Sequence, residues 1–546
     1  MEPIGVVLTE ASTNTARCQL YERAEKGKVS EGMFLLVETT GKRRILARVA
    51  RMVPQNEFFV AGDAWTEARR KQQSIPDQLA RRYELCELEL LGEIPQLTEI
   101  SIPPYAGDQV FTIDVSTSLN EIFGITSQEG IVWYGSLFGY QDAPIPLTIE
   151  GVPMHMAVFG VTGSGKSYDT GALIEKLVKI NAGENTVLSI PMLIIDANAD
   201  YIDYFKHFED KGYFGSSPSI TRYVFSNSPE IKTFRKNIKP IAINLNNLQR
   251  RDLAELIVQY YSGGEKNELQ VAGIETLIEQ MTIRGDMAEH DYQSIFVDLD
   301  TFHRAKARLN ELRTDMIHAA TAAAISRGLD KFQEIENQHR LLSTVPRIEN
   351  EFIDDLTKNR GIAIIDFSAD AAPGIPLSLK QLVISYVSSI LFQRFTDYKV
   401  KRDERYMLFI MEEAQNYCPN LTVYDVGYSL AREKLSLVAT QGRKFGLSLC
   451  LVSQRPSFID PIVLSMCNTF FIHRISPDDV SFVKRVCGGL PSALERRLTT
   501  LERGEVIVTG QMNMVPFPLL IKVPQREVAH TFGKTDVLGA LKRLAK

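Results

Sequence analysis

The stretch from residue 160 to 167 reads GVTGSGKS, and it constrains what this chain can fold into more than any other stretch. A short apolar run at 156–159 precedes it, and residues 168–179 follow it with apolar side chains at helical spacing. A strand, a glycine-rich loop and a helix in this order are typical of a phosphate-binding loop, because glycines let backbone N–H groups turn toward phosphate oxygens at a helix N-terminus. The pattern therefore predicts a nucleotide site on a strand–loop–helix unit.

The residue types within this loop predict how the nucleotide is held. Lys166 is expected to reach the β- and γ-phosphates, and the Ser167 hydroxyl is expected to ligate Mg²⁺. ATP and Mg²⁺ are thus the expected cofactors. The predicted nucleotide-contacting residues are Gly160, Thr162, Gly163, Ser164, Gly165, Lys166, Ser167 and Tyr168.

Length and composition narrow the class of protein. A chain of 546 residues is too long for one ordinary core, and its longest apolar runs fall short of the about 20 residues that a membrane helix needs. No basic leader opens the chain, and the six cysteines are scattered without a C-x-x-C pair, so we expect a cytoplasmic protein with reduced thiols. The net charge of −6 does not exclude nucleic acid, because a basic channel can lie inside an acidic exterior.

Changes in hydrophobic pattern divide the chain into units and predict an α/β fold. Short β-like runs dominate the first hundred residues, strand and helix patterns alternate later, and a long helical stretch interrupts that alternation. The predicted units are a small β-barrel at 1–100, a linker at 101–150, an ATPase core at 151–246 and 358–525, a helical insertion at 247–357, and a tail helix at 526–546.

A basic set lies within the predicted barrel, and two interpretations of it remain open. Runs of charge usually form a solvated face, whereas a nucleic-acid or partner surface is the alternative. The residues are Lys42, Arg43, Arg44, Arg48 and Arg51.

Hydrolysis needs groups beyond the phosphate loop, and residues 407–413 supply two of them. This stretch reads MLFIMEE, an apolar strand that ends in paired acids. Glu412 stands where a metal-coordinating acid is expected, and Glu413 where a water-polarising base is expected. The alternative is an acidic strand end that only faces solvent.

Further candidates follow other apolar runs. Asp196 ends a strand-like run and precedes Asp200 and Tyr201, so it could support the metal shell, support the neighbouring loop, or only cap the strand. Gln454 follows the run at 449–452, and its amide suits a sensor of the γ-phosphate.

Two arginines compete for a role at the nucleotide of a neighbouring subunit. Arg443 lies before the strand that ends near Gln454, and Arg474 is the weaker alternative. An arginine finger of this kind stabilises charge in the transition state.

Taken in order along the chain, these pieces resemble the HerA branch of the HerA/FtsK superfamily of hexameric DNA-translocating ATPases. The matching pieces cover most of residues 130–525. They are Gly135-Ser136-Leu137, residues 155–167, Asp196 with Asp200-Tyr201, EEAQN at 412–416, QGRKFG at 441–446, SQRPS at 453–457, CNT at 467–469, and Gly504-Glu505 leading to Gly510.

The resemblance implies a RecA-like core, an N-terminal barrel of the HAS-barrel kind, and a ring of six subunits with ATP at the interfaces and double-stranded DNA in the central channel. It also implies a separate partner, either a NurA-like nuclease in DNA-end processing or a nuclease or sirtuin-like effector in anti-phage defence. Two departures stand out: Gln415 occupies a position where histidine is common, and Gln441 a position where an acid is common.

We therefore expect an ATP-driven DNA translocase or helicase. Arg432 and Lys434, between the acidic strand and Arg443, are candidate contacts to the DNA backbone, with an exposed helix face as the alternative. One alternative function is an ATP-dependent scaffold that oligomerises and regulates an effector with little translocation. Another is a membrane-associated pump, which the lack of a membrane helix disfavours.

Overall fold

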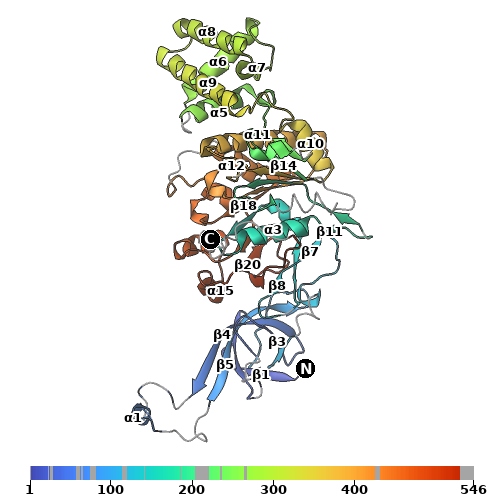
Figure 1. Ribbon diagram of the computed structural model, residues 1–546. Helices are drawn as coiled ribbons and strands as arrows, with labels where there is room; N and C mark the ends of the chain where they lie inside the picture. Colours follow the sequence, from blue (N-terminus) through green and yellow to red (C-terminus); the bar gives the residue numbers. More distant parts are fainter. Residues whose placement is uncertain are drawn as a thin grey trace, which may run out of the picture.

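The computed structural model describes residues 2–22, 24, 29–56, 59, 62, 66–73, 82–113, 120–140, 142–184, 186–202, 220–233, 237–262, 267–369, 371–424 and 431–528. Its three parts follow one another along an elongated molecule, with a β-barrel at one end, an α/β core in the middle and a bundle of helices at the other end (Figure 1). The predicted α/β class, with an N-terminal barrel and a helical insertion, is confirmed.

Six strands close the barrel in the order β1-β2-β5-β4-β3-β6. Side chains alternate between its interior and its surface, as the β2 burial pattern shows. The sixth strand pairs with both β1 and β3, so closure requires residues beyond the boundary predicted at residue 100. The strands are β1 (Pro3–Val7), β2 (Thr15–Leu20), β3 (Phe34–Glu38), β4 (Arg44–Asn56), β5 (Arg82–Ile94) and β6 (Gln109–Thr112).

The basic set of the barrel is largely paired with carboxylates. Arg43 and Arg44 contact Glu93 and Glu121. Arg48 is buried, binds Glu89 at 2.7 Å, and also donates to the carbonyl of Pro518 in the core. This arginine therefore joins the barrel to the core and does not belong to a solvated face.

The core is built on one large sheet with the strand order β15-β14-β16-β13-β17-β18-β10-β19-β20-β21-β8. The strands from β15 to β19 are parallel, and the last three are antiparallel to their neighbours. The parallel strands are β15 (Ile238–Pro240), β14 (Ile220–Val224), β16 (Ile362–Asp366), β13 (Met192–Asp196), β17 (Met407–Met411), β18 (Leu447–Ser453), β10 (Met156–Phe159) and β19 (Thr469–Ile472); the antiparallel ones are β20 (Glu505–Gly510), β21 (Leu519–Lys522) and β8 (Ser136–Leu137).

Helices cover both faces of this sheet, which explains why its central strands are continuously apolar. Met156 and Val158 pack in one hydrophobic cluster with α3 (Lys166–Leu177), whereas Ala157 and Phe159 pack on the opposite face in the cluster that contains α11 (Leu377–Lys401) and α12 (Arg432–Gln441). All four residues of β10 are buried. The phosphate loop therefore leaves the middle of a rigid, doubly covered sheet.

The stretch predicted as a linker at 101–150 contributes to the fold. Besides β6, it holds β8, which pairs with β21 at the edge of the sheet, and a small two-stranded sheet of β7 (Ile131–Tyr134) and β9 (Ile145–Thr148). Tyr140 reaches into the barrel, where its hydroxyl accepts a hydrogen bond from the Phe34 amide at 2.8 Å. Barrel and core therefore share contacts along this segment.

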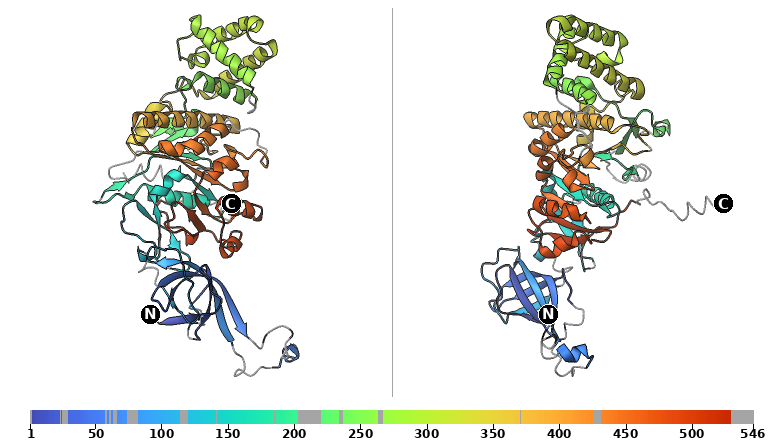
Figure 2. Two further views of the ribbon diagram at one scale, coloured as in Figure 1. Left: turned by 180° about the vertical axis from the view of Figure 1, so that it is seen from behind. Right: turned by 90° about the vertical axis from the view of Figure 1, so that its left-hand side faces the viewer.

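Between β15 and β16 the chain forms the helical bundle, which projects beyond the sheet (Figures 1 and 2). Asn267 and Asp298 cap two of its helices by accepting hydrogen bonds from backbone amides. The helices of the bundle are α5 (Arg250–Ser262), α6 (Glu268–Ile283), α7 (Ser294–Val297), α8 (Leu299–Asp315) and α9 (Ala319–His339). The next helix, α10 (Asn350–Lys358), lies beside α11 over the sheet, where Asp354 pairs with Arg394 (Figure 1).

Smaller elements complete the chain. In the part that the structure describes, no helix combines the length and the apolar character required to cross a membrane. Most of the predicted tail helix at 526–546 lies outside the described residues, which end at 528. The remaining elements are α1 (Thr66–Arg70), β11 (Ile180–Asn181), β12 (Val187–Leu188), α13 (Pro461–Ser465), α14 (Val480–Val486), α15 (Ser492–Arg497) and the 3-10 turns η2 (Ile149–Met154), η3 (Pro229–Thr233), η4 (Leu245–Asn247), η5 (Ala414–Asn416), η6 (Gly442–Phe445), η7 (Pro456–Phe458) and η8 (Pro477–Asp479).

Candidate functional site

The glycine-rich loop connects the carboxyl end of β10 to the first turn of α3. Gly163 and Gly165 have φ values of 78° and 103°, in the region that favours glycine. At Gly160 a Cβ atom would lie 2.4 Å from Ser164 Oγ and 2.8 Å from His473 Cβ, so only glycine fits there. The tight curl of the loop therefore depends on all three glycines that the sequence singled out.

Backbone contacts hold the loop on three sides. The amides of Gly160, Val161 and Ser164 donate to the carbonyls of Ser453, Arg474 and Val161. Among the described residues, no hydrogen-bond acceptor is found for five other amides at the start of α3. They belong to Thr162, Gly163, Gly165, Lys166 and Ser167. Such a group of amides at a helix N-terminus is suited to binding an anion.

Lys166 and Glu412 form a buried ion pair in front of this loop, with 3.4 Å between Nζ and Oε2. Burial alone lowers the pKa of Lys166, but Glu412, Glu413 and Asp200 outweigh it, so the pKa is raised and the ammonium stays charged. Burial raises the pKa of Glu412, and Lys166 opposes that rise. The acidic strand end is therefore buried against the nucleotide loop and does not merely face solvent.

Tyr201 holds the other oxygen of this carboxylate. Its hydroxyl donates to Glu412 Oε1, and both side chains are buried. Burial, and after it Glu412, raises the pKa of Tyr201 well above its usual value, so the phenol keeps the proton that it donates. Glu412 is thus held from two directions, by an ammonium on one oxygen and a phenol on the other.

Asp196 shapes the turn that carries Tyr201. Its carboxylate accepts from the amides of Asn198, Asp200 and Tyr201 at 3.2, 3.0 and 2.9 Å. Burial, and after it the adjacent Asp366, raises the pKa of Asp196. Of the interpretations left open above, support of the neighbouring loop fits these contacts.

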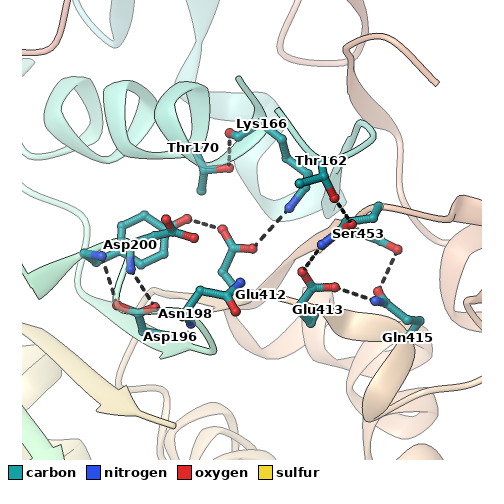
Figure 3. Close-up of polar contacts among 12 residues, drawn as sticks. Thr162, Lys166, Thr170, Asp196, Asn198, Asp200, Glu412, Glu413, Gln415 and Ser453 are labelled. Atoms are coloured by element: carbon teal, nitrogen blue, oxygen red, sulfur yellow. Dashed lines mark hydrogen bonds and ion pairs between the residues drawn. The ribbon is translucent and has the colours of Figure 1, made fainter. Parts of the chain in front are cut away.

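Glu413 is the second residue after β17 and has a φ of 51°, a conformation that non-glycine residues seldom adopt. Two amides hold its carboxylate. Gln454 Nε2 lies 2.6 Å from Oε1. Gln415 Nε2 lies 2.5 Å from Oε2 (Figure 3). Gln454 Oε1 in turn accepts from the Thr162 hydroxyl at 2.6 Å. The predicted base and the predicted phosphate sensor are therefore in direct contact, and the sensor also contacts the loop.

Arg443 lies at the opposite edge of the sheet. It belongs to η6, which precedes β18, whereas Ser453 at the other end of β18 pairs with Phe159 beside the loop. At about 3.3 Å per residue, β18 separates the two by roughly 20 Å. Arg443 is exposed and lies close enough to His155 and Tyr406 to affect their pKa values. It therefore does not reach the nucleotide loop of its own chain.

The two predicted DNA contacts have carboxylate partners within the chain. Arg432 Nε lies 2.7 Å from Oδ2 of Asp460, which is buried, and Lys434 Nζ lies 2.6 Å from Asp252 Oδ1 in the helical bundle. Both cations would have to exchange these partners in order to bind phosphate.

Reasoning from sequence missed the contact of Tyr201 with Glu412 and the part played by Gln415 and Ser453. A signal was present, because polar residues that follow neighbouring parallel strands meet at one edge of the sheet. The order of the strands in the sheet determines which of these side chains are in contact, and that order could not be predicted from the sequence.

Comparison with known proteins identifies relatives. The family model described as "Helicase HerA, central domain" matches residues 132–391. A DNA double-strand break repair helicase HerA of Saccharolobus solfataricus is 24% identical over 99% of this chain and 96% of its own length. The protein of the same name from Sulfolobus acidocaldarius is 23% identical over 96% and 93%.

Solved structures with a similar arrangement include VirB4 of Thermoanaerobacter pseudethanolicus, at a TM-score of 0.49 and 14% identity over 74% of this chain and 98% of that one. Plasmid coupling protein TrwB in complex with a non-hydrolysable ATP analogue has a TM-score of 0.47 and 12% identity, over 75% and 92%.

Proposed function

This chain belongs to the HerA helicase family and is an ATPase, and from that premise we propose that it is the subunit of a ring-shaped, ATP-driven DNA translocase. One observation carries the proposal: Lys166, Glu412, Glu413 and five loop amides that have no acceptor among the described residues lie together at the carboxyl edge of the sheet. This is the set of groups that phosphoryl transfer to water requires from a protein.

This site suits Mg²⁺. The residues proposed to bind the ion, Ser167 and Glu412, are the ones predicted from the sequence. Ser167 stands in the first turn of α3, part-exposed and with no side-chain hydrogen bond among the residues described, so its hydroxyl is available to a metal. Mg²⁺ typically takes one or two carboxylates together with substrate phosphates, and Glu412 supplies one. Bound there, the ion would neutralise charge that develops on the phosphates.

Each remaining side chain then has a defined task. Lys166 neutralises phosphate charge once it exchanges Glu412 for the nucleotide. Glu413 orients water, and its two amide partners limit where its carboxylate points. Gln454 lies between the loop residue Thr162 and Glu413, so arrival or loss of a terminal phosphate changes its partners.

The position of Arg443 supports a ring. We propose that its guanidinium serves the nucleotide of the next subunit, since it is exposed and about 20 Å from the loop of its own chain. Six subunits is the number implied by the family resemblance, with double-stranded DNA in the channel.

The relatives are named for DNA double-strand break repair, which supports DNA as the partner. Arg432 and Lys434 remain proposed backbone contacts, on the condition that DNA displaces Asp460 and Asp252. We further propose that a separate enzyme, a NurA-like nuclease or a nuclease or sirtuin-like defence effector, acts together with the ring.

The decisive experiment measures ATP hydrolysis by the purified full-length protein with and without duplex DNA, beside Lys166→Ala as the inactive control. Stimulation by duplex DNA is expected. Hydrolysis that ignores DNA, together with nucleotide-dependent oligomerisation, would favour the scaffold function instead. Absence of Mg²⁺-dependent hydrolysis under both conditions would refute the proposal.

A further inference from the structure

A continuous chain of hydrogen bonds runs through Glu413. The Thr162 hydroxyl donates to Gln454, Gln454 and Gln415 each donate to one oxygen of Glu413, and the Ser453 hydroxyl donates to Gln415 Oε1 at 2.7 Å. Thr162 comes from the nucleotide loop, whereas Gln415 comes from η5 and Ser453 ends β18. The chain therefore links three elements at the carboxyl edge of the sheet.

The partners of Gln415 determine which way its amide faces. The Ser453 hydroxyl accepts from the Arg455 amide at 3.2 Å, and its own proton points to the nearest acceptor, Gln415 Oε1, with the Arg455 carbonyl more distant at 3.2 Å. With its oxygen occupied in this way, Gln415 presents its NH₂ group to Glu413. Both ends of the Gln415 amide are therefore hydrogen-bonded, and the position next to Glu413 requires a hydrogen-bond donor.

The two amides that hold Glu413 differ in their surroundings. Gln415 and Ser453 are buried beside β18. Gln454 is only half-buried, and its other partner is the exposed Thr162 of the nucleotide loop. One amide is therefore anchored to the sheet, and the other is placed to exchange partners with a ligand in the loop.

From this difference we propose that Gln415 is a positioning residue, which holds the Glu413 carboxylate in its catalytic orientation while Gln454 exchanges between Glu413 and the terminal phosphate. The inference rests on the proposed function, because it assigns Glu413 as the base. It also gives a physical reason for a glutamine at position 415: the side chain needs a donor at one end and an acceptor at the other.

The test replaces the amide with a carboxyl group of the same shape. In Gln415→Glu the amide that donates to Glu413 becomes a carboxylate, so two acceptors of like charge face each other and the hydrogen bond is lost. We expect kcat to fall at least about tenfold relative to wild type, with KM within about twofold, because the base is misoriented while nucleotide binding is retained.

A matched control exists on the surface of the helical bundle. Gln338 donates to Glu334 at 2.7 Å, so Gln338→Glu repeats the same chemical change in an exposed pair far from the cleft. This control is expected to leave the kcat and KM of hydrolysis unchanged.

Two further variants separate positioning from folding. Gln415→Leu removes both hydrogen bonds and is expected to lower kcat at least about tenfold with KM within about twofold, since a misoriented base affects the chemical step and not binding. Gln415→His keeps a donor and an acceptor and is expected to retain kcat within about threefold.

The outcomes are distinct. Absence of ATP hydrolysis by the wild-type protein would refute the proposed function itself. If the wild type is active, a kcat of Gln415→Glu within about twofold of the wild-type value overturns the positioning role. If Gln415→Glu does not fold, a loss in Gln415→His as large as that in Gln415→Leu overturns it equally.

Discussion

The two edges of the parallel sheet differ in how completely a single chain builds them. At the carboxyl edge, Lys166, Glu412 and Glu413 are buried and held by hydrogen bonds or an ion pair. At the amino edge, Arg443 is exposed and Tyr406 is 44% exposed. One edge is organised before any partner arrives, and the other is left accessible.

This difference teaches how the work of catalysis is divided. Buried groups can be preorganised only by the chain that surrounds them, because orientation there depends on dense packing and satisfied hydrogen bonds. A charged side chain on an exposed edge keeps its hydration and so costs little free energy. Its electrostatic interaction becomes stronger when a neighbouring subunit excludes water from it. The comparison leads to four predictions.

The strongest test targets the accessible edge. Arg443→Ala is expected to lower ATP hydrolysis by about 10³-fold or more, because it removes positive charge from the transition state in the neighbouring cleft. Nucleotide binding to the variant, measured with a fluorescent ATP analogue, should persist. Lys444→Ala, which changes the next exposed cation in η6, is the matched control.

Mixed rings decide whether Arg443 acts on a neighbour. Adding Arg443→Ala subunits to wild type should reduce activity by more than the mutant fraction. A strictly proportional loss would show that each subunit works alone, and the contrast between the two edges would then have no functional meaning.

At the organised edge, Glu413→Gln is expected to lower kcat by about 10²–10⁴-fold with the fold intact, since the amide keeps the shape but no longer polarises water. Steady-state hydrolysis and circular dichroism measure the two effects. Glu334→Gln changes the exposed glutamate that pairs with Gln338 and serves as control. Wild-type rates in Glu413→Gln would reject its assignment.

A third prediction concerns what stabilises the amino edge beneath its exposed surface. His155 is buried, accepts from the Leu449 amide at Nδ1, and contacts the Ala439 carbonyl through Nε2. Burial lowers its pKa from 6.5 to about 4. As the pH falls, the unfolded chain therefore binds a proton at this histidine before the folded chain does. The contribution of neutral His155 to the free energy of unfolding is complete above pH 6.5 and is lost as the pH falls from 6.5 to 4.

The loss over that interval amounts to about 3 kcal/mol in the free energy of unfolding. Urea unfolding of wild type and His155→Gln at several pH values measures it, and the variant should show a flatter pH dependence. His318→Gln, at an exposed histidine, should follow wild type. Equal slopes in all three proteins would contradict the assignment.

The smallest effect is expected from Tyr201→Phe, which removes the phenol that holds Glu412. We expect the Mg²⁺ concentration for half-maximal hydrolysis to rise and kcat to fall by about tenfold, as for other residues that orient a metal ligand. Tyr261→Phe, which removes a hydroxyl that accepts from Arg327 at 2.6 Å, is the control. An unchanged Mg²⁺ requirement would show that Lys166 alone positions Glu412.

Sequence reasoning reached much of the organised edge because its signals are local. The glycines of the loop and the acids after β17 lie within a few residues of the elements that place them, so their roles follow from short patterns. The contact of Gln454 with the loop and with Glu413 was not foreseen in detail, but its location at the end of a strand was. Asp196 was left between three interpretations, and its bonds to three amides decided among them.

The limits of that reasoning appear where partners are distant in sequence. Arg432 and Lys434 look like free cations in the sequence, yet their carboxylates come from Asp460 and Asp252, which are 28 and 182 residues away. The predicted end of the barrel at residue 100 was too early for the same reason. The last strand, β6, is recognisable only from its pairing with β1 and β3.

The amino-acid sequence by itself determined the strand–loop–helix unit and the α/β class. It also determined that Lys166 and Glu412 belong to the same site. These depend on local backbone geometry and hydrophobic period. Only the tertiary structure decided that Gln415 holds Glu413, that Tyr201 holds Glu412, and that Arg443 lies at the edge of the sheet opposite its own loop. The order in which parallel strands assemble sets these contacts, and that order is a property of the packed sheet.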